Sequence, residues 1–169
     1  MRLLSVDPSL RSSGFAVLER APAGGKVRVL EYGTIPNTAR LRPSSCLVAI
    51  RDRLSELIQR HEPECGVVEA VIYVQSYRTA ITLGAARGAA LLAMAERGLA
   101  IYEYPPARVK QAVVGRGGAA KEQVAFMVRA LLGLTETPAA DAADAMAIGL
   151  THFQNLDASR LGVHPLQQI

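Results

Sequence analysis

The chain has 169 residues, of which half are hydrophobic and a fifth are charged, and this composition is typical of one folded domain rather than of a disordered chain. The apolar run near the N-terminus is too short for a signal peptide, and no apolar run is long enough to cross a membrane. The formal net charge of +4 is concentrated in residues 78–129, where eight Lys and Arg stand against three Asp and Glu, which suits either a polyanion such as nucleic acid or an ordinary solvated surface.

Three strands are predicted before the first helix. Residues 2–6 are apolar and end at Asp7-Pro8, because proline restricts the backbone of the residue before it. Residues 14–18 form a second short strand. Residues 26–35 alternate apolar and polar side chains and follow a glycine-containing turn at 21–25, so they predict a third strand that returns beside the second.

Helices and strands alternate in the rest of the chain. Apolar residues recur at helical spacing in the first of these helices, and an alanine-rich helix ends at Gly98, which suits a left-handed cap. The helices are expected at 44–61, 79–97, 105–114, 121–132 and 138–154, and the strands at 67–73 and 100–104. This order predicts an α/β domain, in which a mixed five-stranded sheet carries helices on both faces.

No internal repeat or linker divides the chain, so we expect one domain at residues 1–156 and a frayed tail at 157–169. The two cysteines, Cys46 and Cys65, lack the spacing of metal ligands. We expect them to be reduced core thiols, which places the protein in the cytoplasm.

Two acidic residues lie in or at the end of apolar strands. Asp7 closes the first strand, where it suits either a turn residue that binds backbone N–H groups or a functional carboxylate. Glu69 has only apolar neighbours within residues 67–72. A buried carboxylate is costly unless it is paired, so Glu69 predicts either an ion pair with an arginine or a metal ligand.

Two more acidic residues lie near the start of the last predicted helix. Thr137 is a suitable N-cap and Pro138 suits the first helical position. Asp141 and Asp144 are three residues apart and therefore share one face of the helix. Their charge favours a helix N-terminus in any case, but two neighbouring carboxylates also repel each other.

Together these four residues predict a particular chemistry if the fold brings them close to one another. Converging carboxylates either take up protons or hold a divalent cation. An all-oxygen site suits Mg²⁺ or Mn²⁺, and two such ions support the hydrolysis of a phosphodiester.

The motifs resemble those of the RuvC family of Holliday junction resolvases over nearly the whole chain. The matching segments are Val6-Asp7-Pro8, Val68-Glu69, Leu83–Gly88, Arg108–Gly115 and Ala140–Ala145. The resemblance implies an RNase H-like fold and a homodimer that makes symmetric nicks in four-way junction DNA in recombination and repair. It implies Mg²⁺, with Mn²⁺ as a substitute and two ions per site, bound by Asp7, Glu69, Asp141 and Asp144 as the catalytic residues. A branch-migration motor is an expected partner by resemblance only.

The resemblance also places DNA-binding lysines at Lys110 and Lys121, within the basic middle third. A glycine-rich loop at 115–118, between Lys110 and Lys121, carries Arg116 and offers backbone amides to phosphate. The other expected DNA contacts are Arg78, Arg87 and Tyr73, the last of which suits stacking on an unpaired base or an ordinary tyrosine position.

Four residues depart from the family pattern: Ser9, Leu10, Ala70 and Ile72. They spare the carboxylates and bear on junction distortion and cleavage-sequence preference. Two other functions remain open at this point. One is a different RNase H-like nuclease, which would not prefer junctions, and the other is an inactive junction-binding protein.

Overall fold

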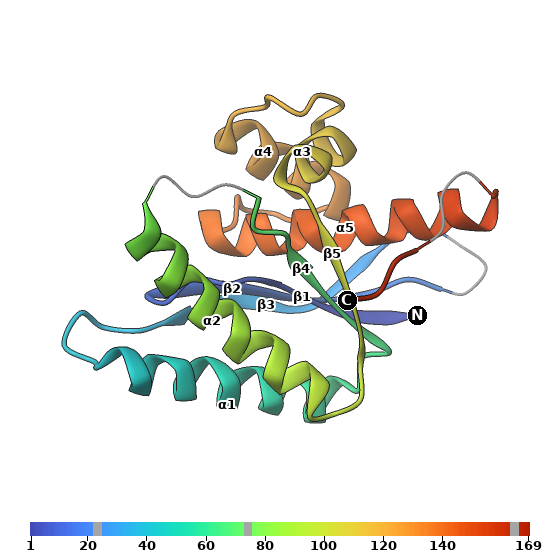
Figure 1. The fold of residues 1–169 in the computed structure, drawn as a ribbon. Helices are drawn as coiled ribbons and strands as arrows, with labels where there is room; N and C mark the ends of the chain where they lie inside the picture. Colours follow the sequence, from blue (N-terminus) through green and yellow to red (C-terminus); the bar gives the residue numbers. More distant parts are fainter. Residues whose placement is uncertain (22–24, 73–75, 163–165) are drawn as a thin grey trace.

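The computed structural model describes residues 1–21, 25–72, 76–162 and 166–169, and in them the predicted fold is confirmed. A mixed five-stranded sheet has the order β3-β2-β1-β4-β5, with helices on both faces (Figure 1). Strands β1 and β4, and β4 and β5, are parallel, whereas β2 is antiparallel to both of its neighbours. The elements are β1 (Arg2–Asp7), β2 (Ser12–Glu19), β3 (Arg28–Pro36), α1 (Pro43–His61), β4 (Cys65–Glu69), α2 (Tyr77–Ala95), β5 (Ala100–Tyr104), α3 (Pro106–Val114), α4 (Lys121–Leu132) and α5 (Ala140–Arg160).

The sheet separates two hydrophobic cores, because successive side chains of a strand point to opposite faces. In β1, Leu4 and Val6 pack with the buried residues of α1 and α2. Leu3 packs with those of α3, α4 and α5 on the other face. Both faces of the central strands are therefore covered, which explains why these strands are apolar along their whole length.

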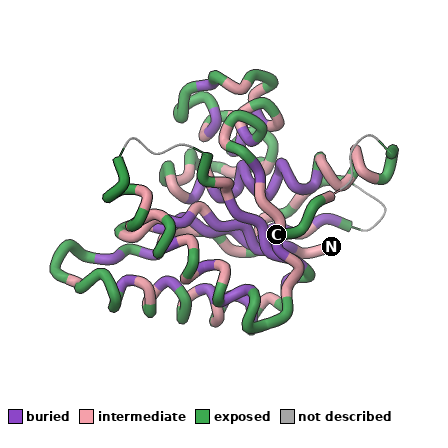
Figure 2. The backbone as a smooth tube through the Cα atoms, in the orientation of Figure 1, coloured by how far each residue is buried: buried purple, intermediate pink, exposed green. Residues whose placement is uncertain are grey.

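Helix α5 is the central helix of the α5 face. It lies between the sheet and the pair α3 and α4 (Figure 1), and its residues from Ala142 to Phe153 are buried except for Asp144 (Figure 2). A helix that is buried on all sides has no polar stripe. Its approach to the sheet is close: a Cβ added to Gly14 of β2 would lie 1.8 Å from the Asp141 carbonyl oxygen, and one added to Gly149 would lie 2.8 Å from Ser5 Oγ.

Two predicted boundaries are wrong. Strand β4 covers 65–69 rather than 67–73, and after it Val71 and Ile72 are exposed, although their apolar character had predicted a continuing strand. Helix α5 begins at Ala140 after an Ala139 N-cap, so Thr137 is not the cap. Its C-terminal end runs beyond residue 154 to Arg160, because Arg20 binds both carboxylate oxygens of Asp157 at 2.7 and 2.8 Å and holds the last turns.

Several local expectations are confirmed. Gly98 has a left-handed backbone, with a φ of 67°, although α2 ends a turn earlier, at Ala95. Cys46 and Cys65 are buried free thiols. The predicted turn at 21–25 includes residues 22–24, which lie outside the described residues. Among the helices of the described chain, none combines the length and the apolar character that a bilayer crossing needs.

Replacement of Gly14 tests the contact between α5 and the sheet. Because the added methyl group of Gly14→Ala would overlap the Asp141 backbone, we expect the free energy of unfolding to fall by about 3 kcal/mol, measured by denaturant titration. The control is Gly88→Ala in α2, where an added Cβ meets nothing within 4 Å; it should stabilise the helix by about 0.5–1 kcal/mol. Equal stability of the two variants would contradict the close packing.

Candidate active site

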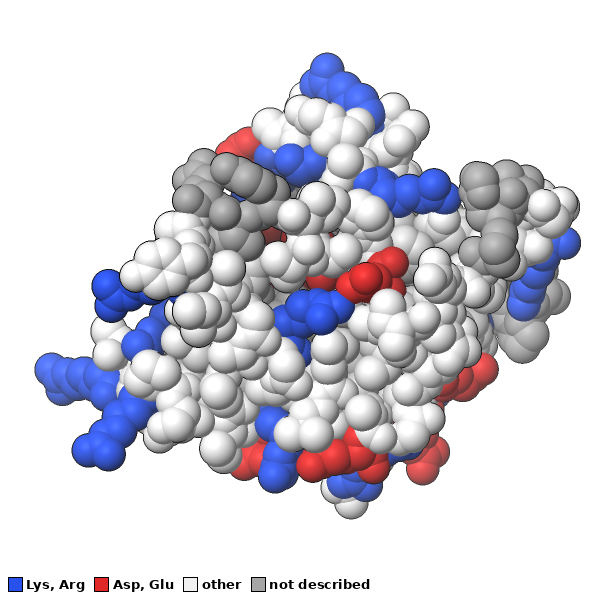
Figure 3. Space-filling model, viewed as in Figure 1, with Lys and Arg blue, Asp and Glu red and all other residues white. Residues whose placement is uncertain are grey.

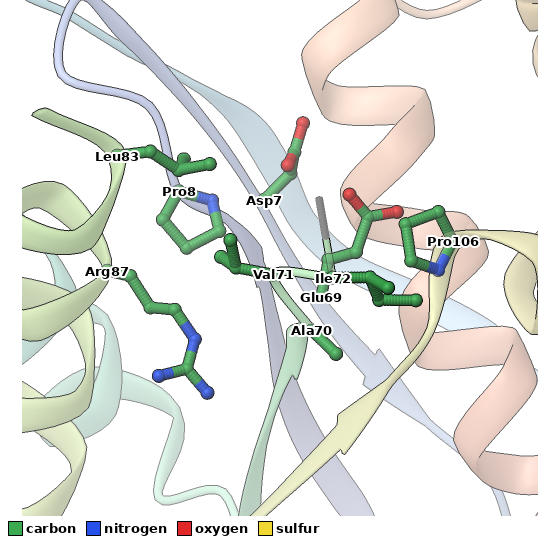
Figure 4. A pocket seen from close by; sticks show the side chains of 9 residues that line it. All are labelled: Asp7, Pro8, Glu69, Ala70, Val71, Ile72, Leu83, Arg87 and Pro106. Atoms are coloured by element: carbon green, nitrogen blue, oxygen red, sulfur yellow. The ribbon is translucent and has the colours of Figure 1, made fainter. Parts of the chain in front are cut away.

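Asp7 and Glu69 occupy equivalent ends of two neighbouring parallel strands. The pairing of β1 with β4 runs up to Val6 and Val68, and each acid is the next residue of its strand. By strand alternation both side chains fall on the face that α5 covers. Figure 4 shows the two carboxylates turned toward the same side of the sheet. Their positions follow from the register of the two strands.

Helix α5 brings the other two acids to the same end of the sheet. Gly14 pairs with Asp7 in the sheet, and the Asp141 backbone lies against Gly14. The Asp141 carboxylate accepts a hydrogen bond from Ser12 Oγ at 2.5 Å. One turn later, Asp144 accepts a hydrogen bond from Lys121 Nζ at 2.9 Å. The absent side chain of Gly14 thus allows carboxylates of a helix and of two strands to gather.

The acids line two adjoining hollows. Asp7 and Glu69 belong to both. One of them extends past Pro8 toward Leu83 and Arg87 of α2 (Figure 4). The other lies beneath α3 and α4 and is also lined by Asp144, Lys110 and Lys121. A ligand that enters from solvent therefore meets two lysines and three carboxylates in one place.

The protonation of Asp7 and Glu69 reflects this gathering. Burial is the largest cause that raises the pKa of Asp7 to about 7, followed by the negative charges of Glu69 and Asp144, while Lys121 opposes the shift. Burial also raises the pKa of Glu69, again with a contribution from Asp144, and Lys121 and Lys110 oppose it. Desolvation and mutual repulsion both disfavour the ionised carboxylates, and a bound cation would relieve both.

The partners of the four acids differ. In the part of the chain that the structure describes, the Asp7 and Glu69 carboxylates have no hydrogen-bond or ion-pair partner, so the predicted arginine pairing of Glu69 and the turn role of Asp7 are not observed. Asp141 and Asp144 are held by Ser12 and Lys121. Among the same described residues, no three acids stand close enough to form a complete metal-ligand cluster. The donor set nevertheless suits a hard, oxygen-binding cation.

The predicted DNA contacts occupy different surroundings. Lys110 and Lys121 line the hollow beside the acids, and Arg78 and Arg116 are exposed. Arg116 donates to Gln123 Oε1 at 3.0 Å. Arg87 is only 21% exposed and forms an ion pair with Glu103 of β5. Its Nε atom is buried without a partner among the described residues. Tyr73 lies outside the described residues.

Ser12 is a site residue that the sequence analysis missed. Its hydroxyl orients Asp141 across a separation of 129 residues, and a serine at the start of a strand gives no signal of such a contact. His152 shares a helix with Asp144 but lies elsewhere. It is fully buried and is hydrogen-bonded to Tyr104 Oη at 2.9 Å. Burial lowers the pKa of His152 to about 4, so the ring is neutral.

The chain is similar to known proteins over nearly its whole length. Residues 3–152 match the family model described as crossover junction endodeoxyribonuclease RuvC. A protein of that name from Akkermansia muciniphila is 53% identical over 157 residues, which are 93% of each chain. One from Chloroflexus aggregans is 42% identical over 153 residues, 90% of this chain and 92% of the relative. The solved structure of Thermus thermophilus RuvC in complex with Holliday junction substrate superposes with a TM-score of 0.84, at 32% identity and full coverage of both chains.

The raised pKa of Asp7 predicts a pH-dependent stability of the metal-free protein. The folded-state pKa, about 7, exceeds the ordinary value of 3.8. Between these values the folded state binds more protons than the unfolded state, so the free energy of unfolding falls as the pH rises. We expect Asp7→Asn to remove this loss and to raise the free energy of unfolding by about 3 kcal/mol near pH 8, but little near pH 4.

Denaturant titrations at the two pH values measure this effect. Glu136→Gln serves as the control, because it removes the same charge from an exposed position outside the site. A gain of equal size at both pH values, or the same gain in the control, would show that Asp7 does not lie in a desolvated cluster of acids.

Proposed function

The chain belongs to the RuvC family of crossover junction endodeoxyribonucleases, the Holliday junction resolvases, and from this premise we propose that Asp7, Glu69, Asp141 and Asp144 carry its phosphodiester hydrolysis. The observation that supports this assignment most is the position of Asp7 and Glu69. They close neighbouring parallel strands beneath the start of α5, and neither carboxylate has a protein partner in the described residues. Partly buried acids without partners are costly to the fold and are typical of functional sites.

The family is metal-dependent, and we propose Mg²⁺, with Mn²⁺ as a substitute and two ions per site. The residues fit hard cations in the type and number of their donors, since all four acids offer oxygen. Bound cations supply activation of a water molecule and neutralise charge at the leaving oxygen. Asp7 and Glu69 would hold the cations between the strands, and Asp141 and Asp144 would bind from the helix.

The remaining residues of the site serve DNA binding. Lys110 and Lys121 line the hollow next to the acids, where their charges favour the approach of a phosphate to a negative centre. The exposed Arg78 and Arg116 suit outer contacts to the DNA backbone. Arg87 is engaged by Glu103, so we assign it a contact with DNA only through the wall of the hollow that it helps to form.

The proposed assembly is a homodimer on four-way junction DNA. Two symmetric nicks in a nearly two-fold junction are most simply made by a two-fold protein. A branch-migration motor as partner, a cytoplasmic location and the division into a domain at 1–156 with a tail at 157–169 also remain predictions.

Cleavage of a labelled synthetic four-way junction tests the function. With Mg²⁺, the wild type should nick two strands symmetrically and leave linear duplex intact. Asp7→Asn should still bind the junction but cut it at least about 100-fold more slowly, the scale on which one catalytic group acts. Equal cutting of linear duplex would favour a different RNase H-like nuclease. Junction binding without cutting in Mg²⁺ and in Mn²⁺ would favour an inactive binding protein.

Metal binding can be measured without DNA. In calorimetric titrations with Mn²⁺, Glu69→Gln and Asp144→Asn should weaken binding at least about tenfold, because each removes a charged oxygen ligand. Glu136→Gln, which lies outside the site, should bind like the wild type. Unchanged affinity in both site variants would contradict the proposed ligand set.

A further inference from the structure

Most of the arginines in residues 1–60 are neutralised within the fold. Six of them form ion pairs with carboxylates: Arg2, Arg20, Arg28, Arg51, Arg53 and Arg60. Arg11 donates to the backbone carbonyls of Thr38 and Leu41 instead. Arg40 and Arg42 are exposed, and within the described residues neither side chain has a hydrogen-bond or ion-pair partner. Their charges are therefore left for solvent or for a ligand.

The sequence around these two arginines keeps their charge uncompensated. No acidic residue occurs between Glu31 and Asp52, and the first turn of α1 carries none. Figure 3 shows Lys and Arg side chains at the end of the molecule where, in Figure 1, the connection from β3 to α1 and the start of α2 lie, without acidic side chains among them in this view. A surface of this kind attracts polyanions.

The connection that carries Arg40 and Arg42, residues 37–42, is anchored rather than loose. Asn37 is 6% exposed; its backbone N–H donates to the Arg11 carbonyl at 2.8 Å and its Nδ2 to the Leu10 carbonyl at 2.9 Å. Arg11 returns hydrogen bonds to Thr38 and Leu41 at 2.8 and 2.9 Å. Because the backbone is already ordered, a ligand bound there would cost little additional loop entropy.

The anchor points belong to the loop that follows Asp7. In the sheet, Asp7 pairs with Gly14, and Gly14 pairs with Thr34 of β3. Two strand spacings thus separate Asp7 from Thr34, about 10 Å. Residues 37–42 therefore leave the sheet at the same end as the candidate active site, well within one helical turn of duplex DNA, about 34 Å.

We propose that Arg40 and Arg42 form a second DNA-backbone contact, which binds phosphates of a junction arm beside the active site on the α1 and α2 face. Lys110 and Lys121 serve the same purpose on the α5 face. The inference rests on the proposed function, because it takes the junction as the ligand. The occupant is duplex DNA, since two uncompensated guanidinium groups on an ordered support match a repeated phosphate array.

The salt dependence of junction binding tests this proposal. A fluorescent four-way junction is titrated in EDTA buffer, so that it is not cut, with salt from about 50 to 200 mM. For Arg40→Gln/Arg42→Gln, the slope of log affinity against log salt should become shallower by about 2, close to 1 for each lost phosphate contact. The conservative pair Arg40→Lys/Arg42→Lys should keep most of the wild-type slope.

The control pair is Lys26→Gln/Arg28→Gln, which removes the same charge at the opposite end of β3, where Arg28 pairs with Glu19. Its slope should match the wild type, and thermal melts should show that all variants fold. An unchanged slope for the Arg40 and Arg42 variant, or an equal change in the control, would overturn the proposal. A wild type without preference for the junction would instead contradict the proposed function.

Discussion

Helix α5 lies directly on β1 and β2, and at Gly14 its backbone fills the space that any other residue would need for a side chain. The candidate site depends on this contact, because Asp141 begins at that point and Asp144 follows one turn later. Gly149 allows a second close approach farther along the helix. The two glycines fix the helix against the sheet at both ends of the buried stretch. The helix can therefore present carboxylates without a flexible loop.

The same packing explains why the fold tolerates acids at this position. Strand alternation sends Asp7 and Glu69 to the α5 face, while their neighbours Val6 and Val68 belong to the core beneath α1 and α2. The acids sit where the strands end and the hollows open, so they are partly rather than fully buried. Even so, burial and repulsion raise the pKa of Asp7 to about 7. The site thus stores an electrostatic cost that a cation relieves, a common compromise between stability and function.

Positive charge surrounds this negative centre on two sides. Lys110 and Lys121 stand on α3 and α4, and Lys121 already binds Asp144. Arg40 and Arg42 stand on the connection from β3 to α1, across the end of the sheet. A DNA backbone approaching several carboxylates alone would be repelled, whereas cations at both sides of the centre lower that barrier. This arrangement also explains why a modest net charge of +4 is compatible with a nucleic-acid partner.

The sequence by itself determined the strand and helix order, the mixed sheet and the four acids, because hydrophobic periodicity and the cost of a charge in an apolar strand are local properties. It failed at Val71 and Ile72, whose apolar side chains continue the strand pattern but have no neighbouring element to cover them. It also failed at the ends of α5, where Ala139 rather than Thr137 precedes the helix and the ion pair between Arg20 and Asp157 extends it. Only the tertiary structure decided that Ser12 orients Asp141, that Glu103 engages Arg87 and that Arg40 and Arg42 lack partners. These outcomes depend on which distant residues meet in space, and a linear pattern carries no information about that.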